Sequence, residues 1–311
     1  MSGIADFNFV ADLDIQLVSR TLKDQDSEGV RWGRVFRKTY DMIYNGQETG
    51  RYRWDQLMKT EKTHFGTLFE INAQREFCFE ANDDDPTDYR ISNVLVDAKW
   101  SQRFGGWMLP PEITDHIALV ATADDALSQW SLGLVRIIPE HRTEGANRDK
   151  KSTLNVDGKM AIDWLWKGAP MPPNVLLQLP RDVVDNIFDH WAGTERTNRL
   201  FRAAEGMIVH RNSVATVSRQ LDAQKRVRYN GGARSALAPE GYIILSGKYY
   251  PALASALQVP VPGPLEYVSV RVVPTDTHDG VLIDGRRWRR AQEGDVVAES
   301  APILPDRGLK E

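Results

Sequence analysis

The stretch Asp97-Ala98-Lys99 carries the residue types best suited to chemistry. It follows the apolar run Val94-Leu95-Val96, and a second carboxylate, Asp88, lies nine residues before Asp97. Because side chains alternate along a strand, Asp97 and Lys99 would point to one side and Ala98 to the other. Mg²⁺ is held by one or two carboxylates and several waters. A nearby lysine can position or deprotonate an attacking water, or stabilise developing negative charge, so this set suits phosphodiester hydrolysis.

Neighbouring segments would have to position these groups. Ser92-Asn93 separates two apolar runs and predicts a tight hairpin turn, which would bring Asp88 close to Asp97 or Lys99. Upstream, Phe65, Leu68 and Phe69 have helical spacing, with Glu70 beside them. Glu70 is the candidate third acid, and Glu76 and Glu80 compete for that role. An acid, one spacer and a lysine on a strand is the pattern of PD-(D/E)xK nucleases, although a solvated strand edge has the same tripeptide.

Longer motifs resemble the NaeI family of type II restriction endonucleases. The similar stretches are residues 59–72, 88–91, 96–99, 101–107 and 225–237, spread over nearly the whole chain. Carried over position by position, the resemblance implies that Glu70, Asp88 and Asp97 are the catalytic acids and Mg²⁺ ligands, and that Lys99 is the catalytic lysine. The acid-rich loop 82–86 departs from the pattern, so the spacing from Glu70 to Asp88 is less certain, and Asp83 to Asp85 could approach the metal.

The resemblance also implies partners. Such an enzyme would be a homodimer, because a palindromic DNA site mirrors a two-fold axis. Its second domain would bind another copy of the site as an activating effector, so that a protomer could hold two duplexes. The implied site is GCCGGC, or another GC-rich palindrome. A DNA methyltransferase would protect host DNA without forming a stable complex. Two alternatives stay open: a DNA-binding regulator with a structural nuclease-like domain, and a monomeric nicking or repair endonuclease.

Composition limits the classes of protein to which the chain can belong. A chain of 311 residues with 41% hydrophobic residues predicts two folded domains. No run of about eighteen apolar residues is present, so no membrane span is expected. The N-terminus has no basic region followed by an apolar run, and the single Cys78 predicts a core residue rather than a disulfide or nucleophile. These features predict a cytoplasmic protein. The histidines show no HExxH spacing, and there is no Cys-His zinc pattern and no P-loop.

Charge is distributed unevenly. The chain has a net charge of −4, yet residues 196–234 contain nine basic and two acidic residues, a net +7, whereas residues 1–173 carry −6. A basic segment within an acidic protein is typical of a phosphate-binding surface. A solvated helical face is the alternative.

The pattern along the chain predicts an α/β (α+β) protein. Helices are expected over 9–25, with Phe9, Leu13 and Leu17 on one side, and over 29–45 and 61–79. Strands are expected near 116–121 and 132–138, in a mixed sheet with the hairpin 88–99, and a helix over 161–166. Lys167 to Pro173 contains three prolines in four residues and predicts a stiff linker. We therefore expect an endonuclease domain over 1–166 and a DNA-binding effector domain over 174–311.

The second domain is expected to contain a helix-turn-helix of the CAP or winged-helix kind. Helices are predicted over 181–191, 194–204 and from Asn212 or Ser213 to about Leu221, followed by strands near 242–245 and 267–273. Gly231-Gly232 would let the backbone approach a ligand. The predicted DNA contacts of this domain are Arg211, Arg219, Gln220, Gln224, Lys225, Arg226, Arg228, Asn230, Gly231, Gly232 and Arg234. In the first domain, Gln102 and Arg103 follow the catalytic strand and are predicted DNA contacts, whereas Trp107 fits either a DNA-contacting loop or the core.

Overall fold

The computed structural model describes residues 12–145, 150–278 and 280–306. The chain divides into two compact units, which are described separately. The first contains residues 1–43 and 58–172, and the second contains residues 44–57 and 173–311. Within the described residues, no helix is long and apolar enough to cross a membrane. The segment 44–57, which the sequence pattern places in the first domain, belongs to the second unit.

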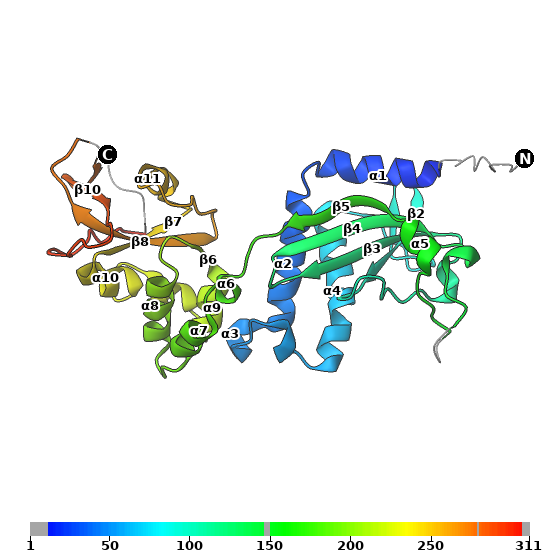
Figure 1. The fold of residues 1–311 in the computed structure, drawn as a ribbon, viewed down its shortest axis with the longest axis horizontal. Coiled ribbons are helices and arrows are strands. Elements are labelled where there is room, and N and C mark those ends of the chain that lie inside the picture. The colour runs from blue at the N-terminus through cyan, green and yellow to red at the C-terminus, as the bar shows by residue number, and fades with distance from the viewer. Residues whose placement is uncertain (1–11, 146–149, 279, 307–311) are drawn as a thin grey trace, which may run out of the picture. The chain divides into compact units, whose positions relative to one another are not determined.

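A five-stranded mixed sheet forms the centre of the first unit (Figure 1). Its order is β1-β2-β3-β4-β5, and β2 and β3 are parallel whereas the other neighbours are antiparallel. The strands are β1 (Tyr89–Ile91), β2 (Val94–Trp100), β3 (Ile117–Asp124), β4 (Gln129–Arg136) and β5 (Asp163–Pro170). Short helical turns connect them: η2 (Pro111–Ile113), η3 (Pro139–His141) and α5 (Val156–Met160). The β2–β3 parallel pair places the predicted catalytic strand next to β3, which is largely buried.

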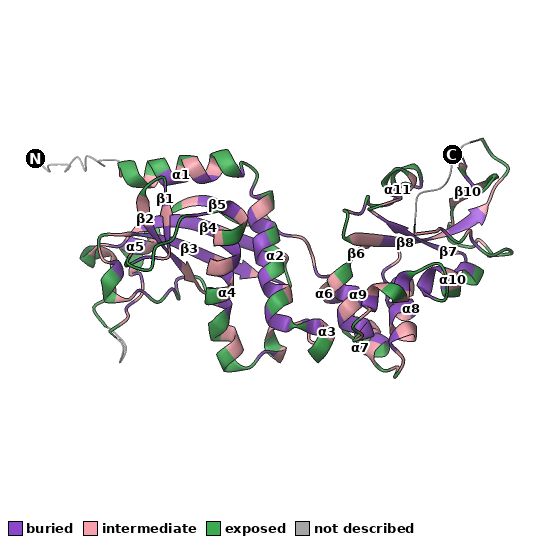
Figure 2. Ribbon diagram, turned by 180° about the vertical axis from the view of Figure 1, so that it is seen from behind, coloured by how far each residue is buried: buried purple, intermediate pink, exposed green. Residues whose placement is uncertain are grey.

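Three longer helices accompany this sheet: α1 (Leu13–Gln25), α2 (Val30–Tyr44) and α4 (Lys59–Phe77). Aromatic side chains of α2 and α4 form a continuous cluster with the sheet. Phe36 stacks on Phe69 at 4.9 Å between ring centroids, and Phe65 lies 4.2 Å from Trp100 of β2. A separate buried cluster around Trp107 contains side chains of β3 and β4. Figure 2 shows the resulting contrast between buried strands and the exposed outer side of α1. Helix α4 is thereby packed against β2, the strand of Asp97 and Lys99.

The structure differs from the sequence pattern at two places in the first unit. In α1 the buried residues are Val18 and Leu22, whereas Leu13 and Leu17 are 75% and 43% exposed; Phe9 lies outside the described residues. Residues 161–166 do not form a helix, because Asp163 to Pro170 pair with β4 as an edge strand. Short apolar runs do not distinguish a helix from a buried strand, and an edge strand tolerates Pro170.

The second unit has a helical part that includes the segment 44–57. This part contains α3 (Gly46–Thr49), η1 (Trp54–Gln56), α6 (Val175–Gln178), α7 (Arg181–Phe188), α8 (Gly193–Ala203), α9 (Arg211–Ser218), η4 (Ala223–Val227), α10 (Ala233–Leu237) and η5 (Ala238–Glu240). Tyr52 belongs to its core and stacks on Phe188, with 5.8 Å between ring centroids. Asn174 donates a hydrogen bond to the Tyr52 carbonyl. The segment 44–57 is therefore an integral part of this core.

The second unit also contains a sheet built around one long strand. Its elements are β6 (Ile208–His210), β7 (Tyr242–Ser246), α11 (Pro251–Ala256), β8 (Glu266–Pro274), β9 (Val281–Ile283) and β10 (Arg286–Arg290). Strand β8 pairs antiparallel with β6, β7 and β10, and β10 pairs with β9. Apart from the short turns η4 and η5, the order along the chain from α8 is α8, β6, α9, α10, β7, α11 and β8. Figure 1 shows α8, α9 and α10 lying on one side of β8.

Candidate active site

The hairpin of β1 and β2 brings the predicted acids together. Ser92 and Asn93 have φ angles of 49° and 67°, the left-handed pair of a two-residue turn that suits the twist of a hairpin. The resulting register pairs Tyr89 with Val96. Asp88, one residue before β1, accepts a hydrogen bond from the Ala98 amide at 2.7 Å. The hairpin therefore holds Asp88 beside the Asp97-Ala98-Lys99 strand.

Asp97 and Lys99 interact directly. Their side chains form an ion pair, as expected for two residues on one side of a strand, whereas Ala98 is fully buried. Asp97 is only 4% exposed. The nearby charge of Asp88 disfavours ionisation of the Asp97 carboxyl group. The hairpin thus places the cation of Lys99 and the carboxylate of Asp88 near the buried carboxylate of Asp97.

Helix α4 contributes Glu70 to the same charged group. The hydroxyl of Tyr89, beside Asp88, donates a 2.8 Å hydrogen bond to the Glu70 carbonyl and so ties α4 to the hairpin. Tyr89 was not predicted to help position the site, although an aromatic residue next to Asp88 was the available signal. Glu76 makes an ion pair with Arg31 at 2.8 Å, and Glu80 is exposed. Of the three glutamates considered, Glu70 is the one that interacts electrostatically with Asp88, Asp97 and Lys99.

Burial and mutual repulsion perturb these carboxyl groups. Burial, followed by the charges of Asp88 and Asp97, raises the pKa of Glu70 to about 7, although Lys99 opposes the shift. Burial likewise raises the pKa of Asp97, because it outweighs the favourable charge of Lys99. In both cases the fold holds a carboxyl group where its ionised form is disfavoured. A cation at this point would relieve that cost.

The donor set fits a magnesium ion. Among the residues that the structure describes, no three His, Cys, Asp or Glu side chains are already arranged as a closed metal site. Mg²⁺ usually keeps several waters and uses one or two carboxylates, so the adjacent Asp88 and Asp97 suffice as protein donors. The acid-rich loop does not supply further ligands, because Asp85 pairs with Arg90 at 2.6 Å and Asp83 and Asp84 are exposed.

The predictions for the segment after β2 have mixed outcomes. Trp107 is fully buried and its indole N–H donates to the Ala121 carbonyl at 2.8 Å, so it is a core residue. Arg103 is exposed, and the Oε1 atom of Gln102 is buried without a hydrogen-bond partner. Cys78, predicted to be in the core, is exposed because it ends α4 in a left-handed conformation, with Phe77 and Phe79 buried on either side.

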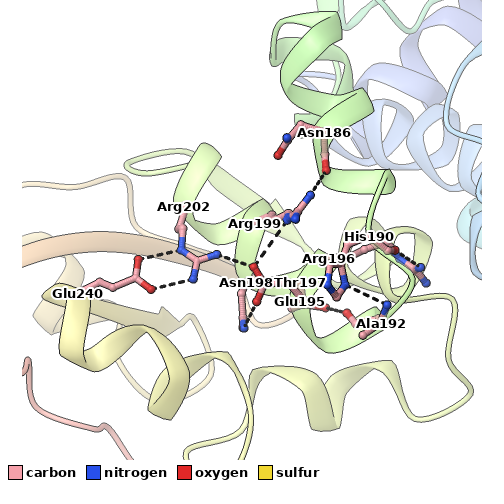
Figure 3. A network of polar contacts seen from close by, with 11 residues as sticks. Asn186, His190, Ala192, Glu195, Arg196, Thr197, Asn198, Arg199, Arg202 and Glu240 are labelled. Carbon is pink, nitrogen blue, oxygen red and sulfur yellow. Dashed lines mark hydrogen bonds and ion pairs between the residues drawn. The ribbon is translucent and has the colours of Figure 1, made fainter.

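In the second unit, several of the basic residues between 196 and 234 have structural partners. Figure 3 shows Arg196, Arg199 and Arg202 in one polar network around α8. Arg196 donates to carbonyls at His190 and Ser218, and Arg202 pairs with Glu195 and Glu240 at 2.9 and 2.7 Å. The net charge of residues 196–234 is therefore larger than the number of basic side chains available to bind a phosphate would suggest.

Four of the predicted DNA contacts have different surroundings from those expected. Arg234 is 3% exposed, donates to the Ile244 carbonyl and pairs with Asp306, so it stabilises the unit internally, contrary to the prediction. The predicted helix up to Leu221 ends at Ser218, because Arg219 closes it with a φ of 53° and donates to the Glu48 carbonyl. Gln220 lies beyond that helix, and Gln224 bonds to Arg211 and Tyr267 within the unit.

The remaining predicted contacts lie near the surface, except Gly232, which is buried. Residues 228–231 form an exposed loop before Gly232 and α10, with Gly231 at a φ of 81°. Arg211 and Lys225 are also exposed, and Arg226, half-buried, pairs with Asp222 at 3.3 Å. The structure thus leaves a smaller basic surface, built from the start of α9, η4 and the following loop.

A buried acid, a neighbouring acid, a lysine and a helical glutamate thus lie together beside a two-stranded hairpin. The family model "Restriction endonuclease NaeI" matches residues 16–299. The chain is 45% identical over 310 residues to "Type II restriction enzyme NaeI" of Lentzea aerocolonigenes, a match that covers 96% of each chain. The chain therefore belongs to the NaeI restriction endonuclease family. It is a type II restriction enzyme, a site-specific deoxyribonuclease.

Proposed function

We propose that this enzyme cuts double-stranded DNA in a Mg²⁺-dependent reaction in which Glu70, Asp88, Asp97 and Lys99 form the active site. The observation that carries the proposal is that Asp88 bonds to the Ala98 amide, between Asp97 and its ion-pair partner Lys99 on β2, with Glu70 near enough for their charges to shift its pKa. A chance DxK tripeptide on a solvated strand would not require such neighbours. The burial of Asp97 also argues against a simple surface role.

Asp88 and Asp97 are the residues that would hold the metal, and Glu70 would assist through the metal or a bound water. Bound Mg²⁺ supplies a water of lowered pKa and neutralises negative charge on the phosphoryl oxygens. Lys99, paired with Asp97, would either take the proton of the attacking water as its neutral amine or, as the ammonium, stabilise the charge that develops at the phosphorus. Tyr89 would keep α4 and the hairpin in register through its bond to the Glu70 carbonyl.

The second unit is proposed to bind DNA through a helix-turn-helix of the winged-helix kind. Its connectivity supports this assignment. In the sheet, β8 pairs with β6 on one side and β7 on the other, and along the chain β8 follows the helices α8, α9 and α10. In this arrangement α10, rather than α9, takes the position of the recognition helix. The exposed loop before α10 carries Arg228, Asn230 and Gly231, and Gly232 starts the helix. We propose that this unit binds a second duplex as an effector and that the enzyme is a homodimer.

The proposed recognition site is GCCGGC. Plasmids with zero, one or two GCCGGC sites, incubated with Mg²⁺ or with EDTA, test the whole proposal. We expect discrete double-strand fragments that require Mg²⁺ and form faster from the two-site plasmid. Fragments that end at other positions would rule out GCCGGC as the recognition site. Nicked circles alone would indicate an enzyme that cuts a single strand. Equal cleavage by Asp97→Asn and wild-type protein would contradict the active-site assignment.

A further inference from the structure

A surface pocket of about 260 Å³ lies in the second unit beside the start of α9. Three chain segments line it. Gln47 comes from α3, Arg211, Asn212 and Ala215 come from α9, and the rest comes from residues 221–225 and Arg228. The pocket therefore combines the second half of the chain with a residue that lies more than 150 positions earlier in the sequence.

Positive charge predominates around this pocket. Its lining contains the basic side chains of Arg211, Lys225 and Arg228 and a single acidic one, Asp222. Asp222 is already paired with Lys225 at 2.9 Å and with Arg226 at 3.3 Å. Arg211 and Arg228 are both exposed, and neither has a carboxylate partner among the residues that the structure describes. Two guanidinium groups thus remain available for an anion.

The close packing of α3 on α9 explains how Gln47 reaches the pocket. A Cβ atom on Gly46 would lie 2.1 Å from Thr216 Oγ1 and 2.9 Å from the Arg51 carbonyl oxygen, so only glycine permits this approach. Arg219 holds the same helix by donating to the Glu48 carbonyl at 3.0 Å. Gln224 is fixed at the opposite wall, since its amide donates to the Arg211 carbonyl and its oxygen accepts from Tyr267. The walls are thus set by contacts within the unit.

We propose that this pocket binds one backbone phosphate of a DNA duplex, with Arg211 and Arg228 as its cations and Gln47 as a neutral hydrogen-bond donor. The inference rests on the proposed DNA binding by the second unit and adds a specific subsite to it. The lining contains no aromatic ring on which a base could stack, and its free groups are cationic or amide, as phosphate recognition requires. The contact would be independent of DNA sequence and would add to affinity and register.

The first test measures binding of a fluorescent 20-base-pair duplex by anisotropy over a range of salt concentrations, in EDTA to prevent cleavage. Each lost phosphate contact lowers the salt slope, d log K/d log[salt], by about 0.9 in magnitude. We expect that loss for Arg211→Ala and for Arg228→Ala, on specific and unrelated duplexes alike. Arg290→Ala is the matched control, because Arg290 is an exposed arginine on β10 that does not line this pocket.

Gln47→Glu tests the unexpected member of the pocket. It keeps the side-chain size and puts a carboxylate against the bound phosphate, so affinity should fall about tenfold or more at low salt and recover toward wild type as salt increases. Gln47→Ala should weaken binding only a few-fold, with an unchanged salt slope. Wild-type affinity of Gln47→Glu, or an equal slope change in Arg290→Ala, would overturn the proposal.

A second probe separates failure of this pocket from failure of DNA binding as a whole. Thermal unfolding is compared in inorganic phosphate and in chloride of equal ionic strength, with the chloride melt also reporting whether each variant folds. Phosphate should stabilise the wild type and Arg290→Ala more than the double variant Arg211→Ala/Arg228→Ala. If wild-type protein binds no duplex but shows this difference, the pocket remains and the DNA-binding proposal fails. Equal stabilisation of all three proteins refutes the pocket.

Discussion

Glu70→Gln should stabilise the metal-free enzyme at alkaline pH while it removes activity. In the wild type, burial and the nearby Asp88 and Asp97 raise the pKa of the Glu70 carboxyl to about 7 from 4.5. Above pH 7 the fold therefore holds an ionised group in surroundings that disfavour its charge. Glutamine keeps the shape of the protonated side chain and carries no charge at any pH, so it isolates this electrostatic cost.

The size and sign of the effect follow from the two pKa values. Between pH 4.5 and 7 the folded wild type binds more protons than the unfolded chain, so its stability falls as pH increases through this interval. A difference of 2.5 pKa units corresponds to about 3 kcal/mol at pH 8. This is an upper limit because Glu70 is only half-buried and solvent screens part of the charge. The advantage of Glu70→Gln should vanish near pH 4.5.

Urea unfolding in EDTA at pH 5 and pH 8 measures this difference. Glu80→Gln is the control, because Glu80 is an exposed glutamate and its substitution should leave the pH dependence unchanged. Added Mg²⁺ at pH 8 should stabilise the wild type more than Glu70→Gln, because the cation relieves the same repulsion. A Glu70→Gln variant that shows the wild-type pH dependence would refute the reasoning that burial and repulsion at this site are costly.

Three further outcomes are expected. Lys99→Met removes the ammonium beside Asp97 and should slow cleavage about 10²–10⁴-fold; duplex binding in EDTA should change little, and wild-type cleavage would contradict the assigned role. A fragment of residues 174–311 lacks Tyr52, so it should unfold without a cooperative transition, and Tyr52→Ala in the full chain should cost about 3 kcal/mol by urea unfolding. A cooperatively melting fragment would show that the segment 44–57 is dispensable. Asp125→Ala removes one of the two carboxylates that pair with the buried Arg37 in the described ion pairs and should cost about 3 kcal/mol by urea unfolding, whereas a loss below about 1 kcal/mol would mean that the interactions left to Arg37 compensate.

Local chemistry made much of the proposed catalytic site predictable. Ser92-Asn93 between two apolar runs specifies a hairpin, and the hairpin alone brings Asp88 to the Ala98 amide. The two-residue period of a strand then puts Asp97 and Lys99 on one side, as their ion pair confirms. These relations connect residues close in sequence, so they follow from turn geometry and alternation.

Other features depend on contacts that no local pattern contains. The run 161–166 becomes a strand only because β4 offers it a partner, and Arg234 is a core residue only because Ile244 and Asp306 surround it. Nothing near Gln47 indicates that it belongs with Arg211 and Arg228, since only the packing of Gly46 on Thr216 brings them together. The sequence by itself determined the hairpin, its acids and its lysine, because their geometry is local. The tertiary structure decided which charges are buried, which are free and which distant segment joins them, because burial and long-range pairing depend on the whole fold.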